Sequence, residues 1–464
     1  MPRRGLGRLL VIVLLVAGTG RAEAAIGTFT QLTCNDALAD LDGVQCGYVE
    51  VPVNRAAERG PTLLLDVIRL QAAIPRPTKA PIAIMTFGSH GALKPDRVRR
   101  FHAHPVRQEH DLAIISQRGL GPVDAPCAEE KRALFDLFAA PDGAETAQAA
   151  FRRVVLACLG RLEALGLPRD ALSFQEMAAD VASVQQAMGW DRFHLWAFDF
   201  ATRPALTVLK QLDDRVVSAV LEGVQPPGAL WMDRWRRTLA HALDQIDAAC
   251  AGRRCGSAAT DSLTDGLIRA SAGLVQRPLD LRVRLTPGQP RVPFVLNALE
   301  FQFLVQHLPL HAKTMPVVPL VIQSARERRA EALANLVSHY WREISLVSQA
   351  TLYSMACADR PAAKADRRAE ADAMAHPKLF APDFAALCRA MPPAASTPAD
   401  AANVNVPTLI VQRALDPQSP PPFARRISDR LSHGQMLTVP GQGETVTDRL
   451  PCGRQLAAAF FATP

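Results

Sequence analysis

The 464-residue sequence lacks the features that mark several common classes of protein. Its lysines and arginines are scattered and do not alternate with aromatic residues, so we expect no nucleic-acid binding. No CxxC pair and no cysteine–histidine cluster has the spacing of a metal site, so we expect no metal and no cofactor. After residue 25 no apolar run approaches the roughly 18 residues of a membrane-spanning helix, so we expect no transmembrane segment.

The first 25 residues have the pattern of a secretory signal peptide. Three arginines precede an apolar core at 9–16, and small residues at 22 and 24 form a cleavage pattern. The arginine pair at 3–4 lacks the rest of the twin-arginine motif, which favours the ordinary secretory route. We expect cleavage near Ala24 or Ala25 and a secreted or periplasmic chain. Losing four Arg and one Glu lowers the formal charge from +7 to +4.

Nine cysteines in an exported chain favour disulfide bonds, because the compartment beyond the membrane is oxidising. Their spacing suggests the pairs Cys34–Cys46, Cys127–Cys158, Cys250–Cys255 and Cys357–Cys388. Cys452 is left without a partner in this scheme. The odd count alone requires at least one cysteine outside the intramolecular pairs.

Eight short apolar runs predict the strands of one sheet. They are Tyr48–Val53, Leu63–Leu70, Ile82–Phe87, Leu112–Ser116, Phe193–Ala197, Val216–Leu221, Thr408–Gln412 and Gln435–Val439. From the third run onward the connections are long enough for helices, and continuous apolar strands are typical of parallel sheets buried on both faces. We therefore predict an α/β fold with a mostly parallel, eight-stranded sheet.

The same pattern divides the chain into four parts. They are a signal peptide (1–25), the first part of the sheet domain (26–224), a helical lid (225–404) and the C-terminal part of the sheet domain (405–464). Between about 225 and 404 the strand signal disappears, and helix-period segments such as Leu230–Ile246 and Leu333–Met355 alternate with Pro- and Ala-rich connections. Because the strand pattern resumes at Thr408, the lid is predicted to be inserted before the seventh strand.

One helix is predicted from its capping signal. Ser173 and Glu176 have the spacing of a capping box, in which each side chain satisfies a backbone N–H of the first turn. Apolar residues then recur at helical spacing from Phe174 to Met188, and Gly189 follows as a C-terminal cap. The helix leads into the predicted strand at 193–197.

The segment after that strand has the steric pattern of a nucleophile elbow, a tight turn between a strand and a helix. Such a turn needs small residues two positions before and two positions after its central residue. Ala197 and Ala201 meet this demand. The central residue, however, is Asp199 and not serine.

In their order along the chain, these motifs resemble the tripeptidyl-aminopeptidase-type (TAP-like) α/β hydrolases, exported relatives of prolyl aminopeptidase. The matching segments are Gly88-Ser89-His90-Gly91 (glycine-rich oxyanion loop), 116–121 (the Asp-x-Arg-Gly-x-Gly motif, with Ser116 for Asp), 177–180, 189–193, 220–224, 415–420 (acid motif) and 440–444 (histidine motif). The resemblance implies an α/β-hydrolase fold over nearly the whole mature chain. It also implies that Gly88, His90, Gly91, Arg118 and Phe200 lie at a ligand-binding site.

Residue by residue, the resemblance places Asp199, Asp416 and Glu444 at the positions of the catalytic serine, acid and histidine. A serine hydrolase needs a hydroxyl nucleophile and a base with a pKa near neutrality. Asp199 lacks the hydroxyl, and a glutamate has an ordinary pKa of about 4.3. Because losing one triad member typically removes of order 10⁴–10⁶-fold in rate, we predict that serine-hydrolase activity is absent.

Three functions remain open for such a degenerate triad. The leading one is an exported, non-catalytic protein that binds a peptide-like or amine-bearing small ligand, or a protein partner. The second is an active hydrolase with Asp199 as nucleophile, as in haloalkane dehalogenases and epoxide hydrolases, where Glu444 would have to replace the histidine. The third is an accessory or structural protein that uses the surface of the lid. Asp199 is also suited to cap the following helix.

Three carboxylates that converge repel one another, so one of them must hold a proton or pair with a positive group. The groups that could supply this positive charge are Arg118 or Arg203, the ammonium group of a ligand, or a hard metal ion bound by oxygens. If no cation compensates, replacing Asp199 by Asn or Glu444 by Gln should stabilise the protein at pH 7.

Overall fold

The structure, a computed structural model, describes most of the chain after residue 26. The described residues are 27–56, 60–76, 78–86, 93–119, 127, 130, 135–136, 144–228, 231–250, 262–286, 288–310, 314–344, 348–358, 371–372, 374–379, 384–391 and 404–464. Within these ranges no helix is long and apolar enough to cross a membrane. The predicted signal peptide lies outside the described residues and stays a prediction.

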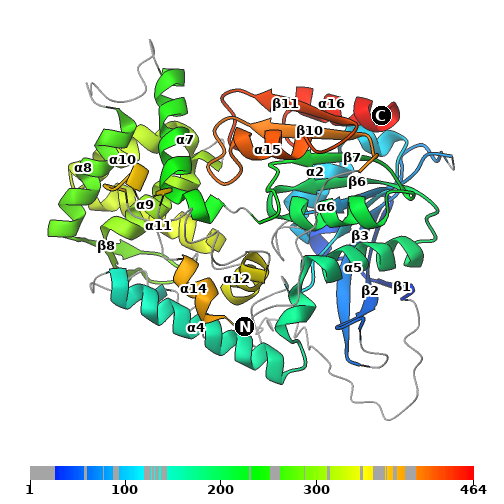
Figure 1. The fold of residues 1–464 in the computed structure, drawn as a ribbon, viewed down its shortest axis with the longest axis horizontal. Helices are drawn as coiled ribbons and strands as arrows, with labels where there is room; N and C mark the ends of the chain where they lie inside the picture. The colour runs from blue at the N-terminus through cyan, green and yellow to red at the C-terminus, as the bar shows by residue number, and fades with distance from the viewer. Residues whose placement is uncertain are drawn as a thin grey trace, which may run out of the picture.

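A nine-stranded sheet occupies one half of the molecule (Figure 1), in the order β1-β2-β3-β5-β4-β6-β7-β10-β11. The strands are β1 (Phe29–Leu32), β2 (Val44–Pro52), β3 (Thr62–Leu70), β4 (Ile82–Met85), β5 (Leu112–Ile115), β6 (Phe193–Phe198), β7 (Val216–Glu222), β10 (Thr408–Arg413) and β11 (Gly434–Val439). The pairs from β1 to β5 are antiparallel, and all pairs from β5 to β11 are parallel. The predicted mostly parallel sheet is confirmed.

All eight predicted strands form, and the predicted number of eight is one too small. The additional strand, β1, pairs with β2, and the disulfide between Cys34 and Cys46 joins the end of this pair. Three of the four residues in β1 are exposed. The strand therefore has no apolar pattern by which the sequence could reveal it.

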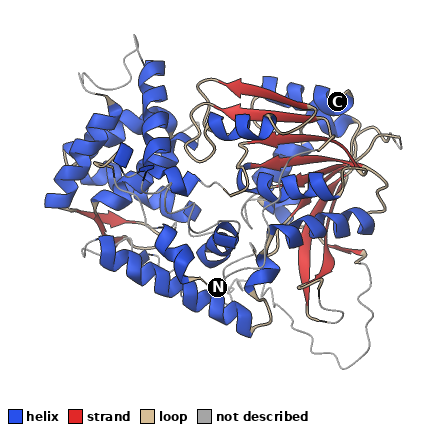
Figure 2. Cartoon of the chain, in the orientation of Figure 1, coloured by secondary structure: helices blue, strands red, loops and turns tan. Residues whose placement is uncertain are grey.

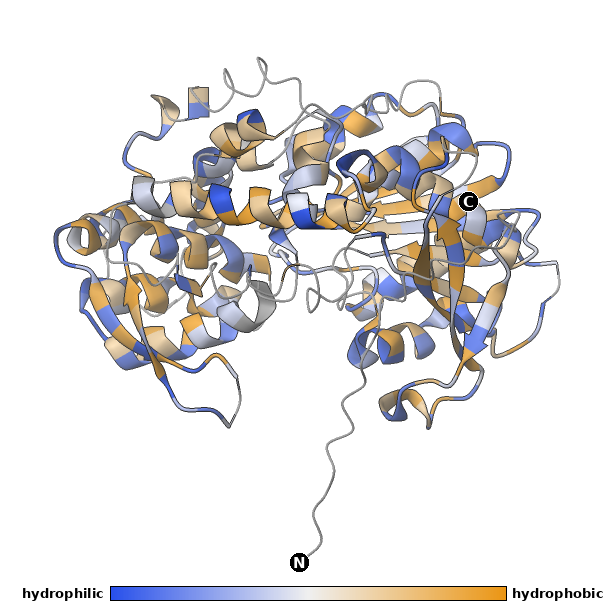
Figure 3. Ribbon diagram, turned by 90° about the horizontal axis from the view of Figure 1, so that it is seen from below, coloured by the Kyte–Doolittle hydropathy of each residue, from blue (hydrophilic) through white to orange (hydrophobic). Residues whose placement is uncertain are grey.

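Helices cover both faces of the sheet. α5 (Phe174–Ala187), α6 (Thr202–Gln211) and α15 (Pro421–Ser428) pack on one face, and α2 (Pro95–His102) and α16 (Pro451–Ala462) pack on the other. Successive strand residues enter opposite cores: Leu195 joins the first core and Trp196 the second. The inner strands β4, β5 and β6 are therefore apolar at nearly every position, and orange predominates in the sheet (Figure 3).

The predicted helix at 174–188 forms α5, with half of its predicted capping box. The Ser173 hydroxyl accepts the backbone N–H of Glu176 at 3.3 Å, and Gly189 follows with a φ of 66°. The Glu176 carboxylate does not bond back to the cap. It accepts a hydrogen bond from the Arg55 guanidinium at 2.5 Å, because the N-terminal strands lie against this end of the helix.

The chain between β7 and β10 is mainly helical (Figure 2). Its helices are α7 (Trp235–Cys250), α8 (Leu263–Gln276), α9 (Ala298–His307), α10 (Val318–Arg326), α11 (Ala330–Ile344), α12 (Gln349–Ala358) and α14 (Phe384–Ala390). The earlier helix α4 (Ala144–Ala164) packs against α12. That this segment acts as a lid, with bounds at 225 and 404, stays a prediction.

The expectation that strands are absent from 225–404 is wrong. An antiparallel pair, β8 (Leu279–Val283) and β9 (Val292–Leu296), forms within this segment. In β8 the apolar residues at 279, 281 and 283 are buried, and the charged residues between them are exposed. Five alternating residues are a real but short signal, which the surrounding helical pattern obscured.

Three of the four predicted disulfides are confirmed: Cys34–Cys46, Cys127–Cys158 and Cys357–Cys388. Cys452, near the start of α16, is exposed and has a free thiol, as the spacing scheme predicted. The fourth predicted pair, Cys250–Cys255, falls on residues whose side chains lie outside the described part.

Candidate active site

Asp199 occupies a sharp turn between β6 and α6. Its φ is 52°, in the left-handed region that few residues other than glycine adopt. Ala197 and Ala201 are completely buried on either side, which explains the need for small residues there. The Asp199 side chain itself is 34% exposed. The structure therefore keeps the geometry of a nucleophile elbow without its hydroxyl group.

A buried arginine joins two of the three triad positions. Arg413 is the last residue of β10, and its Nη2 donates to one carboxylate oxygen of Asp199 and one of Asp416. The second oxygen of Asp416 accepts the backbone N–H groups of Gln418 and Ser419 at 2.8 and 3.1 Å. Burial lowers the pKa of Arg413, but the two carboxylates outweigh burial and raise it above its ordinary value.

Gly223 makes room for this contact at the end of β7. A Cβ at this position would lie 2.4 Å from Nη2 of Arg413 and 2.7 Å from Oδ1 of Asp199. Its φ of 67° also disfavours other residues. A side chain here would separate the guanidinium from the elbow.

Glu222 anchors the loop that follows the histidine position. Its fully buried carboxylate accepts the backbone N–H of Val446 at 2.5 Å, and the N–H and hydroxyl of Thr447 at 3.0 and 2.5 Å. Burial raises the pKa of Glu222 to about 7, although the nearby Arg413 opposes this shift. The loop at 445–447 is thereby held against the end of the sheet.

Glu444, at the position predicted for the catalytic histidine, forms an ion pair with Arg449 at 2.7 Å. Both side chains are partly exposed, at 18% and 34%. Two arginines thus compensate the three carboxylates: Arg413 for the elbow and the acid, and Arg449 for the histidine position. The triad carboxylates are paired within the protein, and neither arginine is among those that the sequence analysis named.

Arg118 and Arg203, the named candidates, have other partners. All five N–H donors of Arg118 are used: two bond to Asp180 at 2.5 and 2.7 Å, and three bond to backbone carbonyl groups. Arg203 lies over the ring of Phe174 at 5.1 Å and that of Phe200 at 6.0 Å. Arg118 therefore ties α5 to the N-terminal strands and has no donor left for a ligand.

Of the remaining predicted ligand-binding residues, Phe200 is the one that the structure describes, and it does not lie at an open site. Phe200 is only 4% exposed and packs against Phe174, with 5.5 Å between the ring centroids. This places it in the apolar core beside the elbow. Gly88, His90 and Gly91 lie outside the described residues.

Sequence reasoning missed Arg413, Glu222 and Gly223, although all three carried a signal. Arg413 ends one strand, and Glu222 ends the neighbouring strand and is in register with Val411. Because the carboxyl ends of parallel strands meet at one edge of the sheet, polar residues that end adjacent strands come together there. Asp199, after β6, lies at the same edge.

A histidine of the inserted segment, His307 at the end of α9, approaches the acid loop. Its Nε2 lies 3.4 Å from the side-chain nitrogen of Gln418, and its Nδ1 faces the carbonyl oxygen of Phe303 at 2.7 Å. Its ring also stacks on that of Phe303, with 4.8 Å between the centroids. Both ring nitrogens are thus engaged away from the elbow, so these contacts do not make His307 a replacement base.

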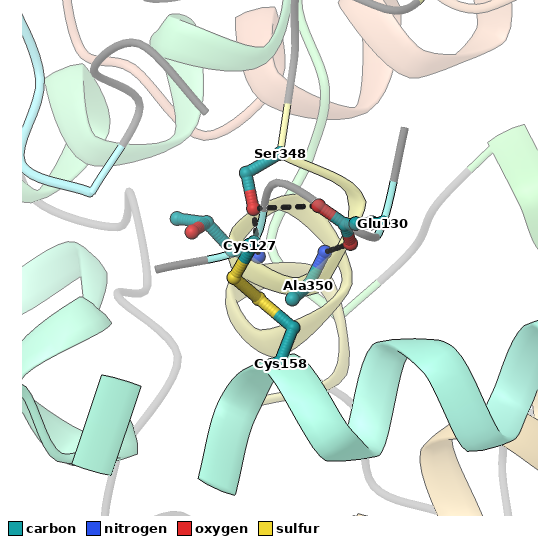
Figure 4. The surroundings of a disulfide bond; sticks show 6 residues. Cys127, Glu130, Cys158, Ser348 and Ala350 are labelled. Atoms are coloured by element: carbon teal, nitrogen blue, oxygen red, sulfur yellow. Dashed lines mark hydrogen bonds between the residues drawn. A yellow bond between two sulfur atoms is a disulfide. The ribbon is translucent and has the colours of Figure 1, made fainter. Parts of the chain in front are cut away.

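One group of potential metal ligands occurs in the described part of the chain. Cys127, Glu130 and Cys158 offer three ligand atoms within 4.8 Å of one another, but the two sulfurs are joined in a disulfide (Figure 4). Glu130 instead accepts the backbone N–H of Ala350 at 2.7 Å and the hydroxyl of Ser348 at 3.3 Å, and so caps α12. Burial raises its pKa to about 7. In this oxidised state the cluster does not fit a metal ion.

The surface also has a hollow of about 440 Å³, which lies away from the triad positions. It is lined by Pro421, Pro422, Arg425, Arg426, Asp429 and Arg430, in and directly after α15. No triad residue lines it.

The strand order, the crossover connections and the elbow define an α/β-hydrolase-fold protein. Residues 378–464 match the family model described as TAP-like protein, which confirms the predicted relationship to TAP-like hydrolases in this part of the chain. That segment includes Asp416 and Glu444, the residues predicted at the acid and histidine positions.

Solved α/β hydrolases of low sequence identity also align with this chain. Proline iminopeptidase from Mycobacterium smegmatis is 12% identical, with 89% of this chain and 97% of that chain covered and a TM-score of 0.43. A thermophilic esterase from Thermogutta terrifontis is 10% identical, with 89% and 98% covered and a TM-score of 0.37. An α/β-hydrolase-fold protein from Chitinophaga pinensis is 10% identical, with 94% and 98% covered and a TM-score of 0.37. No curated protein matches the sequence.

Proposed function

We propose that this protein is an exported, non-catalytic α/β-hydrolase homologue that binds a peptide-like or amine-bearing ligand at its former catalytic site. The contact that carries the proposal is the bridge from Arg413 to Asp199 and Asp416. An aspartate nucleophile needs a free carboxylate and a base that activates water for the second step. Here the carboxylate is paired with a guanidinium, and the histidine position holds a glutamate that is itself paired with Arg449.

Two features of Asp199 support retained binding. One carboxylate oxygen, Oδ2, has no hydrogen-bond donor among the described residues, and a third of the side chain is exposed. Its left-handed backbone conformation costs of order 1–3 kcal/mol of stability, and the surrounding structure must enforce it. Strained residues of this kind cluster at active sites and ligand-binding sites. An ammonium group of a ligand is suited to pair with the free oxygen.

Export is part of the proposal and rests on the disulfides and the leader pattern. Three disulfide bonds in the described part suit an oxidising compartment. The lid is proposed to be the segment between β7 and β10. Binding of a protein partner, and a purely structural role of that segment, are the alternatives that a binding experiment separates from this proposal.

Activity assays on the purified protein test the loss of catalysis. We expect no hydrolysis of aminoacyl or peptidyl chromogenic substrates and no labelling by a fluorophosphonate probe. The matched control is Asp199→Ser, which restores the hydroxyl and should remain inactive because the base is still absent. Turnover that resists the fluorophosphonate and disappears in Asp199→Asn would instead establish Asp199 as a nucleophile.

A further inference from the structure

The loop that carries Asp416 also belongs to the core of the inserted segment between β7 and β10. Its Leu415 is 2% exposed and lies in the hydrophobic cluster that α7 to α11 and the β8–β9 pair build. Apart from Phe135 and Leu415, all buried members of that cluster lie in the inserted segment. Asp416, the next residue, binds Arg413 on the side of the sheet. Two consecutive side chains therefore join the inserted segment to the triad site.

The end of α9 contacts the same loop through polar groups. The Gln306 side chain is completely buried, and its Nε2 donates to the carbonyl oxygen of Pro417 at 3.3 Å. The ring nitrogen Nε2 of the neighbouring His307 lies 3.4 Å from the side-chain nitrogen of Gln418. Because β10 ends on the side of the sheet that faces the inserted helices, the loop after it lies within reach of α9 (Figure 1).

The loop at the position predicted for the catalytic histidine also touches the inserted segment. Directly after α9, the short turn η6 (Leu308–Leu310) places the carbonyl group of Pro309 against Gly443. A Cβ at Gly443 would overlap that group and lie 2.8 Å from its carbon atom. The carbonyl oxygen of Gln442 accepts the backbone N–H of Leu415 at 2.8 Å. The inserted segment and the two loops therefore meet at one place.

These contacts link the position of the inserted segment to the charge at the elbow. In the closed arrangement one nitrogen of Arg413 serves both Asp416 and Asp199, so the three groups together carry a net negative charge. If the inserted segment moves away with Leu415, Asp416 must leave the guanidinium, because the two residues are adjacent in the chain. Arg413 then pairs with Asp199 alone and neutralises it. An ammonium group is therefore attracted more strongly to the closed form.

We propose that the loop 415–418 couples closure of the inserted segment to ligand binding at the elbow. Closure brings Asp416 to Arg413 and leaves negative charge for the ligand at Asp199. A bound ammonium group in turn stabilises the closed form, since such coupling is reciprocal. The consequence for binding rests on the proposed function. The coupling itself is a property of the protein alone and is tested without a ligand.

Carboxylate labelling of the full chain reports the position of the loop. A carbodiimide activates accessible carboxylates for attack by glycine ethyl ester, and peptide mapping by mass spectrometry gives the labelling rate of each residue. Asp416 is fully buried, so it should be labelled slowly in the parent, and the exposed Asp191 is the reference. Hydrogen exchange of the peptide 298–310 reports the opening of the inserted segment in the same samples.

Gly443→Ala places a methyl group against Pro309 without backbone strain, because Gly443 has no positive φ. The crowding destabilises the closed form and not the open one. We expect labelling of Asp416 and exchange of 298–310 to become about 5- to 150-fold faster, the factor that a typical cost of overpacking gives. The matched control is Gly273→Ala in the same inserted segment, where a Cβ would meet no atom within 4 Å. Both rates should keep their parental values in this control.

Two further variants keep the test decisive. Gln306→Leu removes the bond to Pro417 and keeps the size of the side chain, so it should accelerate both rates by a smaller factor. Arg413→Gln removes the partner of Asp416 and should, by reciprocity, accelerate exchange of 298–310. Circular dichroism establishes that each variant is folded before its rates are compared.

The possible failures can be told apart. Faster exchange of 298–310 with parental labelling of Asp416 would show that the segment opens without moving the loop, so the inference would be wrong and the proposed binding function would stand. Parental rates in folded Gly443→Ala and Gln306→Leu would have the same consequence, because these contacts would not hold the segment closed. If Asp416 in the parent is labelled as fast as Asp191, the bridge from Arg413 is not the resting state, and the proposed function fails with the inference.

Discussion

Replacing Arg413 by glutamine should expose the electrostatic design of the triad site. The guanidinium is 3% exposed and lies between Asp416, which is fully buried, and Asp199, which is 34% exposed. Breaking a buried ion pair by removing one partner typically costs about 3–5 kcal/mol. Asp416 keeps two backbone N–H donors, and Asp199 can turn toward water, so we expect a loss of about 2–4 kcal/mol at pH 7.

The loss should depend on pH in a defined direction. Burial already raises the pKa of Asp416 in the parent, although Arg413 opposes this shift. Without the guanidinium, the pKa of Asp416 in the folded variant should rise further above its value of about 3.9 in the unfolded chain. A raised folded pKa favours the protonated folded form, so the penalty is nearly absent below that unfolded value. It grows as the pH rises and levels off above the folded pKa. The difference in unfolding free energy between parent and variant should therefore be small at pH 4 and large at pH 7.

Urea denaturation of parent and variant at both pH values measures this difference. Arg449→Gln is the control, because it also removes an arginine that pairs with a triad carboxylate, but both partners are partly exposed. It should cost no more than about 1 kcal/mol, with a weak pH dependence. A loss for Arg413→Gln that is below about 1 kcal/mol at pH 7, or equal at pH 4 and pH 7, would refute the reasoning.

Two further predictions concern groups outside the triad site. Because its thiol is free and exposed, Cys452 should react rapidly with an alkylating probe in the absence of reductant. Peptide mapping should find the three described disulfides intact, and labelling of Cys127 or Cys357 in the native protein would contradict the disulfide scheme. Burial raises the pKa of Glu300 to about 8 from an unfolded value near 4.5, so the folded state loses stability as the pH rises between these values. In urea denaturation, Glu300→Gln should therefore have a free energy of unfolding up to about 2–4 kcal/mol higher than the parent at pH 8, and nearly the same as the parent near pH 4.5. A variant that is less stable than the parent at pH 8 would show that the ionised carboxylate stabilises the fold.

Much of the fold could be predicted because its strands are buried on both faces. A strand such as Phe193–Phe198 must be apolar at every position, which is visible in the sequence without any knowledge of its neighbours. β1 and the pair β8–β9 were missed for the opposite reason: they are short and partly exposed, so few of their positions carry an apolar residue that reveals a strand. The disulfides were predictable from spacing, since close cysteines in an exported chain have few other partners.

The sequence by itself determined the residue types at the triad site. The elbow holds Asp199, the position predicted for the histidine holds Glu444, and small residues flank the turn, so the sequence predicts no serine-hydrolase chemistry at this site. The sequence could not decide which cations face these carboxylates. Arg413 reaches Asp199 across 214 positions of the chain, and only the adjacent placement of β6, β7 and β10 brings the two together. Arg118 was named from the sequence as a partner of these carboxylates, but it pairs with Asp180 instead, because a guanidinium pairs with the carboxylate that the fold places beside it.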